Sequence, residues 1–524
     1  MIAWIVEAWK WKPRGFRGSN DEKSPPISAP DSSPPRFKTR TRLIRSEAPD
    51  NPPPIVSPSR GRFADDRTIL ELSLPSIGTG LITISYIWID TYFIGRMENA
   101  YLAESGVAAL TVSWFSVWIF GSIISLNEVG LTALVGRYVG AGKRSAAAYA
   151  GGQGLRLCLV LYVPVAILGW LAAPWVFAVA NSDPIVSTEG SAYVRMYFLG
   201  GFATLVQRSA VAVFRGHGNT FLPFIVAVGG LILNAILNPI FIYGRGYFDG
   251  MGVSGAALAT VLAQAASCLL TVTLLSRQRW IDSTKPPDEE LRLTPTTPLH
   301  HPRALGLDFN IFVRVTRVGI PVSVSGVLFS LIYIWMTGIV DEAGGTAAVA
   351  GLGVGLRGEA VAFLICSGYS VAASSLVSRR LGAGDPDGAQ RFAWRCVAHC
   401  ALGCGAWAIV LFTMDDTIAA LLIPNEGAAQ EYSKSFFRII AVCLVPLAFE
   451  VVLEGAFGGA GLTIPPMIVT VFLTLIRIPL AIWVVRSLHA GAEGIWWVIS
   501  LTAIARAVVL AIWFSRGTWK TRSV

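Results

Sequence analysis

The stretch Leu134–Gly142, LVGRYVGAG, decides the fold, because it is repeated 242 residues later as Leu376–Gly384, LVSRRLGAG. Each copy follows a long apolar run and precedes a short charged patch. A second pair of stretches, Phe214–Pro223 (FRGHGNTFLP) and Phe457–Pro466 (FGGAGLTIPP), is offset by 243 residues. Two matches in the same order and at nearly the same offset predict that the chain is a duplication of one unit.

The composition is that of an integral membrane protein. Of 524 residues, 53% are hydrophobic and 14% are charged, whereas about a quarter of the residues in soluble domains are charged. The chain holds twelve apolar runs, each long enough for a membrane-spanning helix of about 20 residues. These runs cover roughly residues 70–94, 107–130, 153–180, 192–214, 220–244, 251–275, 312–340, 347–371, 393–413, 434–456, 464–485 and 492–515.

The charges in the loops set the predicted orientation. Lys and Arg gather in the connections from even-numbered to odd-numbered spans, as at Arg379 and Arg380, and the opposite connections carry acids such as Asp415 and Asp416. Because basic loops stay in the cytoplasm, both termini are expected there. We therefore predict an all-α membrane protein with twelve transmembrane helices in two parallel six-helix repeats.

The domain boundaries follow from the same pattern. Residues 1–68 form a basic tail rich in Pro and Ser, which has too little apolar sequence to fold. We expect six-helix lobes at residues 69–275 and 311–515, a cytoplasmic linker at 276–310 and a C-terminal tail at 516–524.

Ionisable residues inside a span are costly in hydrocarbon and are therefore functional candidates. Asp90 in the first span is the candidate coupling carboxylate, and the alternative is a position one helix turn from the outer boundary. Asn234 and Asn238 share one face of the fifth span, and Thr260 lies in the sixth. These four residues form the predicted cation-coupling site, with interhelical packing as the alternative role of the two amides.

The second half has its own polar residues. Glu450 and Glu454 lie four apart in the tenth span, Arg357 and Glu359 lie in the eighth, and Arg477 lies in the eleventh. Two carboxylates on one helix face repel unless a proton, a cation or an Arg lies between them. These residues are candidates for coupling in the second lobe. The alternative is that the two Arg residues form structural ion pairs with Glu359 and Glu450.

Aromatic residues indicate where substrate would bind between the lobes. The tripeptide YIW occurs at residues 86–88 and again at residues 333–335, and Gln207 is the first-half counterpart of a second-half Glu at the 243 offset. We expect the substrate cavity to be lined by Tyr86, Trp88, Gln207, Tyr333 and Trp335.

The chain lacks the motifs of several other classes. Its seven Cys all lie in apolar runs, so no disulfide framework is expected. Cys396, His399, Cys400 and Cys404 form a stripe on the ninth span, which we interpret as packing, and no metal site is expected. The Gly-rich junctions lack the Lys-Ser/Thr of a P-loop, which excludes ATPase chemistry, and there is no HExxH motif of a zinc protease.

Further motifs carry a family resemblance. LNAILNPIFIYG (233–244), GMGVSGAALATVLAQ (250–264) and AEGIWW (492–497) accompany the doubled junctions. Together they resemble the multidrug and toxic compound extrusion (MATE) family of the MOP flippase superfamily. GLRGEAVAF (355–363), which leads to the second junction, is similar to the DinF-like branch of that family. The resemblance covers about residues 68–515.

The resemblance implies a two-lobed antiporter that exports amphipathic, often cationic compounds in exchange for H⁺ or Na⁺, without a cofactor. It implies that Asp90, Asn234 and Thr260 form the polar site of the first lobe. Asn238 stands where many members have Asp, and Ser330 is the nearby polar residue of the seventh span, where other members carry Glu. The expected partners are a small-molecule substrate and membrane lipid, with no nucleic acid, and the expected state is a monomer in a bacterial inner membrane, with the plastid envelope as the alternative.

Two other functions stay open. A flippase for a lipid or lipid-linked sugar would have a cationic cavity, to which Arg208, Arg357 and Arg477 could contribute. An integral membrane transferase would need acidic or His/Asp pairs in a loop that holds a donor, and the loops here are short. Two matching halves suit alternating access better than one catalytic site, so we expect a transporter and not an enzyme.

Overall fold

The computed structural model describes residues 62–179, 183–245, 248–282, 303–304, 306–423 and 427–521. Its helices are α2 (Arg62–Ile94), α3 (Ala100–Gly140), α4 (Arg144–Val179), α5 (Pro184–Gly216), α6 (Phe221–Tyr243), α7 (Gly252–Arg277), α8 (Phe309–Gly382), α9 (Pro386–Thr413), α10 (Asp415–Leu422), α11 (Ala428–Ala441), α12 (Leu444–Ala460), α13 (Ile464–Leu475), α14 (Arg477–Arg486) and α15 (Gly491–Ser515). Two antiparallel hairpins pair β1 (Gly244–Arg245) with β2 (Phe248–Asp249) and β3 (Arg303–Ala304) with β4 (Leu307–Asp308).

The helices of the described chain account for twelve membrane spans. Ten helices are long and apolar enough to cross a membrane, and α11 with α12, bent by 61° at their junction, supply another span. The long α8 contains one residue with non-helical dihedral angles, Gly345 (φ 65°, ψ −165°), and therefore consists of two helices. The predicted all-α architecture of twelve spans is confirmed.

One boundary prediction is wrong. Residues 62–68, expected in the unfolded tail, are the first two turns of α2. Asp65 provides a carboxylate in the first turn, where the helix dipole favours negative charge, and the apolar residues Ile69 and Leu72 that follow are buried. The rest of the predicted tail, residues 1–61, lies outside the described residues, as do residues 283–302 and 305 of the predicted linker.

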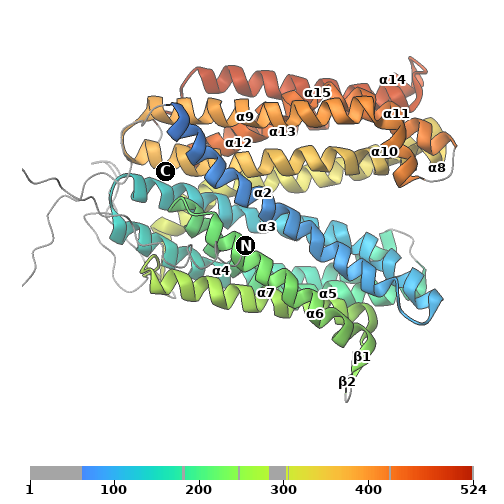
Figure 1. The fold of residues 1–524 in the computed structure, drawn as a ribbon, viewed down its shortest axis with the longest axis horizontal. Coiled ribbons are helices and arrows are strands. Elements are labelled where there is room, and N and C mark those ends of the chain that lie inside the picture. Colours follow the sequence, from blue (N-terminus) through green and yellow to red (C-terminus); the bar gives the residue numbers. More distant parts are fainter. Residues whose placement is uncertain are drawn as a thin grey trace, which may run out of the picture. The chain divides into compact units, whose positions relative to one another are not determined.

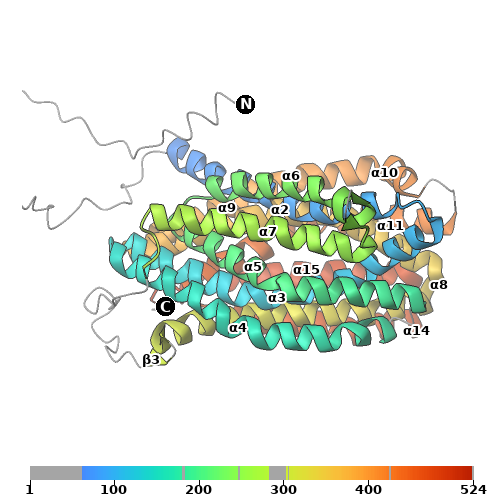
Figure 2. The same cartoon turned by 90° about the horizontal axis from the view of Figure 1, so that it is seen from below.

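The two halves form two groups of helices. In Figure 1, α3 to α7 occupy the lower part of the view, α9 to α15 (orange to red) occupy the upper part, and α2 (blue) runs from the upper group on the left down to the lower group on the right. Figure 2 shows α3, α4, α5 and α7 of the first half side by side. The first helix of each half also reaches the other: Ile69 and Leu72 of α2 join the core of the second half, and Ile311 and Val315 of α8 join a core of the first half.

The two repeated junctions lie against each other. Gly136 of α3 is packed on Ser378 of α8, where any added Cβ would overlap the Ser side chain. Gly140 and Gly382 face the backbone carbonyls of Arg379 and Arg137 in the same way. Glycine is needed at these places because only a residue without Cβ lets two helix backbones approach so closely.

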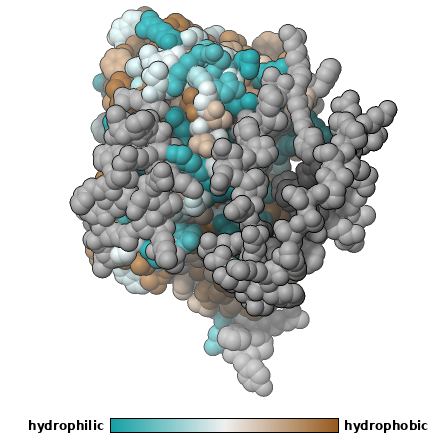
Figure 3. Space-filling view, turned by 90° about the vertical axis from the view of Figure 1, so that its left-hand side faces the viewer, coloured by the Kyte–Doolittle hydropathy of each residue, from teal (hydrophilic) through white to brown (hydrophobic). Residues whose placement is uncertain are grey.

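The close approach lies at one end of the helices, where α3 and α8 both end. Arg137 extends the contact by donating from Nη2 to the Ala460 carbonyl at 3.0 Å. Ser375 Oγ of α8 donates to the Arg215 carbonyl of α5 at 2.5 Å. Figure 3 looks onto this end, where hydrophilic residues gather between hydrophobic ones at the rim. The two halves are thus joined at the end that the sequence predicts to be cytoplasmic.

Candidate functional site

Asp90 is the centre of a buried polar cluster in the first half. Its side chain, on α2, is 1% exposed. Oδ1 accepts a hydrogen bond from Asn238 Nδ2 at 2.8 Å, and Oδ2 accepts one from Thr260 Oγ1 at 3.2 Å. Asn234 Nδ2 donates to Thr260 Oγ1 at 2.9 Å, and Asn238 Nδ2 also reaches Asn234 Oδ1 at 3.2 Å. The structure therefore brings all four residues predicted for this site into one network.

The helix periodicity explains how the cluster forms. Asn234 and Asn238 are four residues apart in α6, so both point to the side where α2 and α7 pack. Gly230, one turn earlier on the same face, has no side chain, and a Cβ there would lie 2.7 Å from the hydroxyl of Tyr86. Tyr86 is thereby held beside the cluster on the helix that carries Asp90.

The cluster has two chemical features that distinguish it from ordinary helix packing. Asp90 forms no ion pair with any residue that the structure describes, so its carboxylate is stabilised only by uncharged donors. The Oδ1 of Asn238 is buried and accepts no hydrogen bond. Buried polar atoms are nearly always satisfied in proteins, so an unused carbonyl oxygen next to a carboxyl without a counter-charge could accept a hydrogen bond or contact a cation.

The second half holds an ion pair that the sequence analysis missed. Glu450 Oε1 lies 2.6 Å from Nη1 of Arg506, and both side chains are buried. The alternative that Arg357 and Arg477 form ion pairs with Glu359 and Glu450 does not hold for Glu450, whose partner is Arg506, and Arg357 is exposed. The signal was present in the sequence: Arg506 interrupts the apolar run of the twelfth span and should have been treated like the other intramembrane charges.

Arg477 makes hydrogen bonds rather than the predicted ion pair. Its guanidinium donates to Thr502 Oγ1 at 2.7 Å, to the Ile499 carbonyl at 3.2 Å and to the Tyr333 hydroxyl at 3.4 Å. Arg477 and Thr502 are the counterparts of Asn234 and Thr260, at offsets of 243 and 242 residues. The duplication therefore extends to the buried polar residues. The Asn234–Thr260 hydrogen bond of the first half corresponds to the Arg477–Thr502 hydrogen bond of the second half.

The other second-half candidates lie around this ion pair. Glu454 accepts a hydrogen bond from Thr470 Oγ1 at 2.6 Å. Glu359 is half-buried and lies close enough to Arg477 and Arg506 to interact with their charges. The second oxygen of Glu450 is buried without a hydrogen-bond partner. The second half thus gathers three carboxyl groups and two guanidinium groups in its interior.

The predicted substrate-cavity residues do not form one group. Tyr86 and Tyr333 belong to the two polar clusters, whereas Trp88 is 71% exposed and Trp335 is 69% exposed. Gln207 is half-buried, and its Oε1 has no hydrogen-bond partner. Ser330 is bonded to the Gly326 carbonyl of its own helix at 3.0 Å. Whether substrate touches the aromatic residues stays a prediction.

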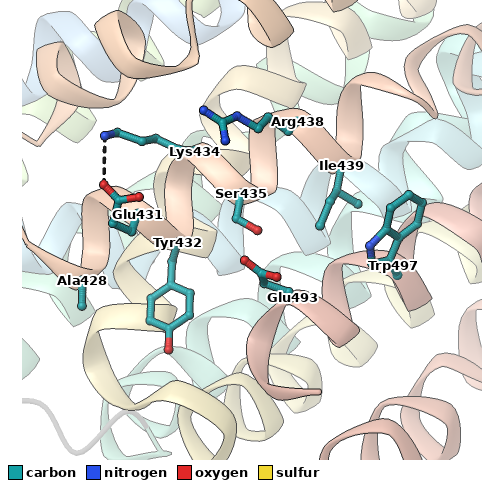
Figure 4. Close-up of a pocket in the computed structure, with 9 residues that line it drawn as sticks. All are labelled: Ala428, Glu431, Tyr432, Lys434, Ser435, Arg438, Ile439, Glu493 and Trp497. Carbon is teal, nitrogen blue, oxygen red and sulfur yellow. Dashed lines mark hydrogen bonds and ion pairs between the residues drawn. The ribbon is translucent and has the colours of Figure 1, made fainter. Parts of the chain in front are cut away.

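An open pocket of about 620 Å³ lies elsewhere, at one end of the second half. It contains none of the predicted site residues. Its lining comes from α11 and the first turns of α15, and Lys434 is bonded to Glu431 across part of it at 2.9 Å (Figure 4). Its lining residues are Ala428, Glu431, Tyr432, Lys434, Ser435, Arg438, Ile439, Glu493 and Trp497.

Comparison with known proteins agrees with the duplicated fold. The probable multidrug resistance protein NorM of Thermotoga maritima is 26% identical over 87% of this chain and 94% of its own length. The multidrug resistance protein MdtK of Yersinia pseudotuberculosis is 24% identical over 86% of this chain and 95% of its own.

Solved structures share the fold. A MOP superfamily transporter from Pyrococcus furiosus superposes with a TM-score of 0.76 at 22% identity, covering 88% of this chain and 97% of that one. A multidrug resistance MATE family transporter in an outward-facing conformation gives 0.75 at 21% identity, with the same coverage. The MatE family model matches residues 75–240 and 321–483, one segment in each half and more than half of the chain. This protein therefore belongs to the MatE family of membrane transporters.

Proposed function

We propose that the protein is a secondary active antiporter that exports amphipathic, cationic small molecules in exchange for a cation. The observation that carries this proposal is the buried Asp90 carboxyl, which has amide and hydroxyl donors but no counter-charge. The names of the similar NorM and MdtK proteins, both multidrug resistance proteins, support the substrate class. Those relatives are bacterial, which supports a place in a bacterial inner membrane.

The coupling follows from the cost of burying charge. An isolated carboxylate is unfavourable in a low-dielectric interior, so Asp90 is stable there when it carries a proton or contacts a cation. Alternating access between two lobes would expose the cluster to one side of the membrane at a time. Loading on one side and release on the other then ties the movement of the coupling ion to the conformational change.

We infer that the coupling ion is H⁺ rather than Na⁺. Sodium needs several oxygen ligands, and here the amide nitrogen of Asn238 and the hydroxyl of Thr260 are directed at Asp90 as donors. The family resemblance implies a second Asp at the position of Asn238, and this chain has an amide there. One carboxyl with one exchangeable proton is the simplest device that this set of residues supports.

Transport in proteoliposomes tests the proposal. Efflux of a fluorescent organic cation is measured with a pH gradient or a sodium gradient imposed separately. Wild-type protein should respond to the pH gradient alone, and Asp90→Asn should abolish that response while its elution from a sizing column is unchanged. Glu71→Gln is the matched control, because Glu71 is an exposed carboxylate on the same helix. Transport driven only by sodium contradicts proton coupling, and normal transport by Asp90→Asn removes Asp90 from the mechanism.

A further inference from the structure

We propose that three buried cysteines of the second half, Cys366, Cys400 and Cys404, form a binding site for a soft, thiophilic metal ion of the Cu(I) type. Cys366 lies on α8, and the other two lie one turn apart on α9. All three are fully buried. The stripe on α9 supplies two of the three thiols, and α8 supplies the third.

The distances between the sulfur atoms fit a three-coordinate metal site. The Sγ of Cys366 lies 3.4 Å from that of Cys404 and 3.6 Å from that of Cys400, and the two α9 sulfurs are 4.0 Å apart. With metal–sulfur bonds of about 2.3 Å, three ligands of one ion lie about 3.8–4.0 Å from one another. The three thiols are thus within about half an ångström of a coordinating arrangement.

The set of ligands favours Cu(I) over zinc. Structural zinc is almost always four-coordinate, and among the described residues no fourth His, Cys, Asp or Glu joins this group. Thiolate ligands select soft ions, and Cu(I) accepts three sulfurs. Binding exchanges the thiol protons for the metal: if all three thiols release their protons, one Cu(I) leaves the site with a net charge of −2, and uptake is therefore expected to increase with pH.

The position of the three cysteines inside one lobe predicts that the bound Cu(I) stabilises the protein and is not itself transported. The site joins α8 to α9 inside the core of the second half, beside Ala362, whose carbonyl faces Cys404. Because both helices belong to one lobe, the site can stay intact while the lobes move against each other. Binding is therefore expected to stabilise the folded protein.

Metal binding to the purified full-length protein in detergent, under reducing conditions, tests this proposal. Cu(I) is supplied from a complex with a chromogenic chelator, and transfer to the protein is followed by loss of the chelator colour. Wild type should take up one Cu(I) per chain. Cys366→Ser and Cys404→Ser should bind at least tenfold more weakly. Cys396→Ser is the matched control, since Cys396 is buried on α9 one turn from Cys400 but outside the group, and it should bind like wild type.

Two further readouts separate a site from a folding defect. X-ray absorption of the bound copper should show three sulfur neighbours, and the thermal midpoint of wild type should rise with Cu(I) but not with an equal concentration of Zn²⁺. The midpoint of each variant without metal shows whether it is folded. Uptake below one ion per chain by wild type, or equal uptake by folded Cys366→Ser and Cys404→Ser, overturns the proposal.

Discussion

If Asp90 carries the coupling proton, the residue at position 238 sets whether the first-half cluster holds one carboxyl group or two. Asn238 donates to Asp90 at 2.8 Å, so an Asp in its place would put two carboxyl groups in hydrogen-bond contact. Such a pair cannot easily be doubly charged and titrates as a unit. In Asn238→Asp the transport rate, measured as a function of pH in proteoliposomes, should therefore show a second titration step.

The neutral variant Asn238→Ser serves as the control for this change. It keeps one carboxyl group and should keep a single titration step. An unchanged profile in Asn238→Asp would show that this position does not share the proton of Asp90.

The Glu450–Arg506 pair is expected to be a determinant of stability. Removing one partner of a buried ion pair leaves an uncompensated charge, which costs about 3–5 kcal/mol of unfolding free energy. Glu450→Gln should lower the thermal midpoint strongly, and Glu450→Gln with Arg506→Met should recover most of the loss. The exposed Glu342, bonded to Arg486 at 2.9 Å, is the control, and Glu342→Gln should leave the midpoint unchanged. A double variant as unstable as the single one contradicts the pairing.

His217, which follows α5, makes stability depend on pH. Its ring is stacked on Trp280 at 4.1 Å, and burial together with nearby Arg379 and Arg144 lowers the pKa of His217 from 6.5 to about 4. Between pH 4 and pH 6.5 the unfolded chain binds one more proton at this residue than the folded chain does. The contribution of His217 to the unfolding free energy is therefore greatest above pH 6.5, and it is lost as the pH falls toward 4.

His217→Phe should remove this part of the pH dependence. The variant keeps an aromatic ring against Trp280 but has no titratable group. Thermal midpoints measured from pH 7 to pH 4 should fall less steeply than in wild type. In terms of unfolding free energy, the difference in slope is up to about 1.4 kcal/mol per pH unit, the value for one proton. Parallel curves for the two proteins would contradict the assignment.

At the scale of the residue, the sequence shows which side chains belong to a polar site more readily than it shows which side chains contact each other. Asp90, Asn234, Asn238 and Thr260 could be grouped because a charge in an apolar run and two amides on one helix face are visible in one dimension. The partner of Glu450 could not be chosen among several Arg residues, since pairing depends on how far each helix is rotated and shifted. For the same reason Cys366 could not be assigned to the cysteine group from the sequence, because it lies on another helix, 34 residues from Cys400 in the chain.

At the scale of the element, the repeated junctions act as a contact between helices. A side chain at Gly140 would overlap the backbone carbonyl of Arg379, which cannot move away as a flexible side chain does. Gly140→Val should therefore separate the ends of α3 and α8 and favour a state that is open at this end, which the sequence predicts to be cytoplasmic. Gly121→Val is the matched control, because nothing lies within 4 Å of a Cβ at Gly121 on the same helix.

Distance measurements between spin labels test this prediction. With one label near the end of α3 and one near the end of α8, Gly140→Val should lengthen the mean distance and Gly121→Val should leave it unchanged. Identical distances in both variants would show that the close approach does not hold the two halves together.

The positions of the helices were predictable from long apolar runs and basic loops. The break in α8 at Gly345 lies between the predicted spans 312–340 and 347–371, and glycine adopts the positive φ found there without strain. The bend between α11 and α12 was not predictable, because it lies inside one apolar run, 434–456, and leaves the hydropathy pattern unchanged.

At the scale of the whole molecule, the duplication predicts two lobes but not how they exchange contacts. Asp65, at the start of α2, pairs with Arg395 of α9 at 3.0 Å, so a helix of the first half is anchored to the second. If the lobes rock during transport, this contact has to break or move. A covalent link across it should then stop transport, whereas a link within one lobe should not.

Paired cysteines at Asp65 and Arg395, joined through two disulfides by a short bis-methanethiosulfonate reagent, test this prediction in a Cys268→Ser background, since Cys268 is only half-buried. Cation efflux driven by a pH gradient should be lost after cross-linking and return with reductant. Cysteines at Asp416 and Lys434, whose side chains are 2.8 Å apart within the second half, form the control, and their cross-link should leave efflux intact. If the Asp65–Arg395 link also leaves efflux intact, the start of α2 moves with the second half, and the boundary between the moving bodies lies further along α2, between this anchored start and Asp90.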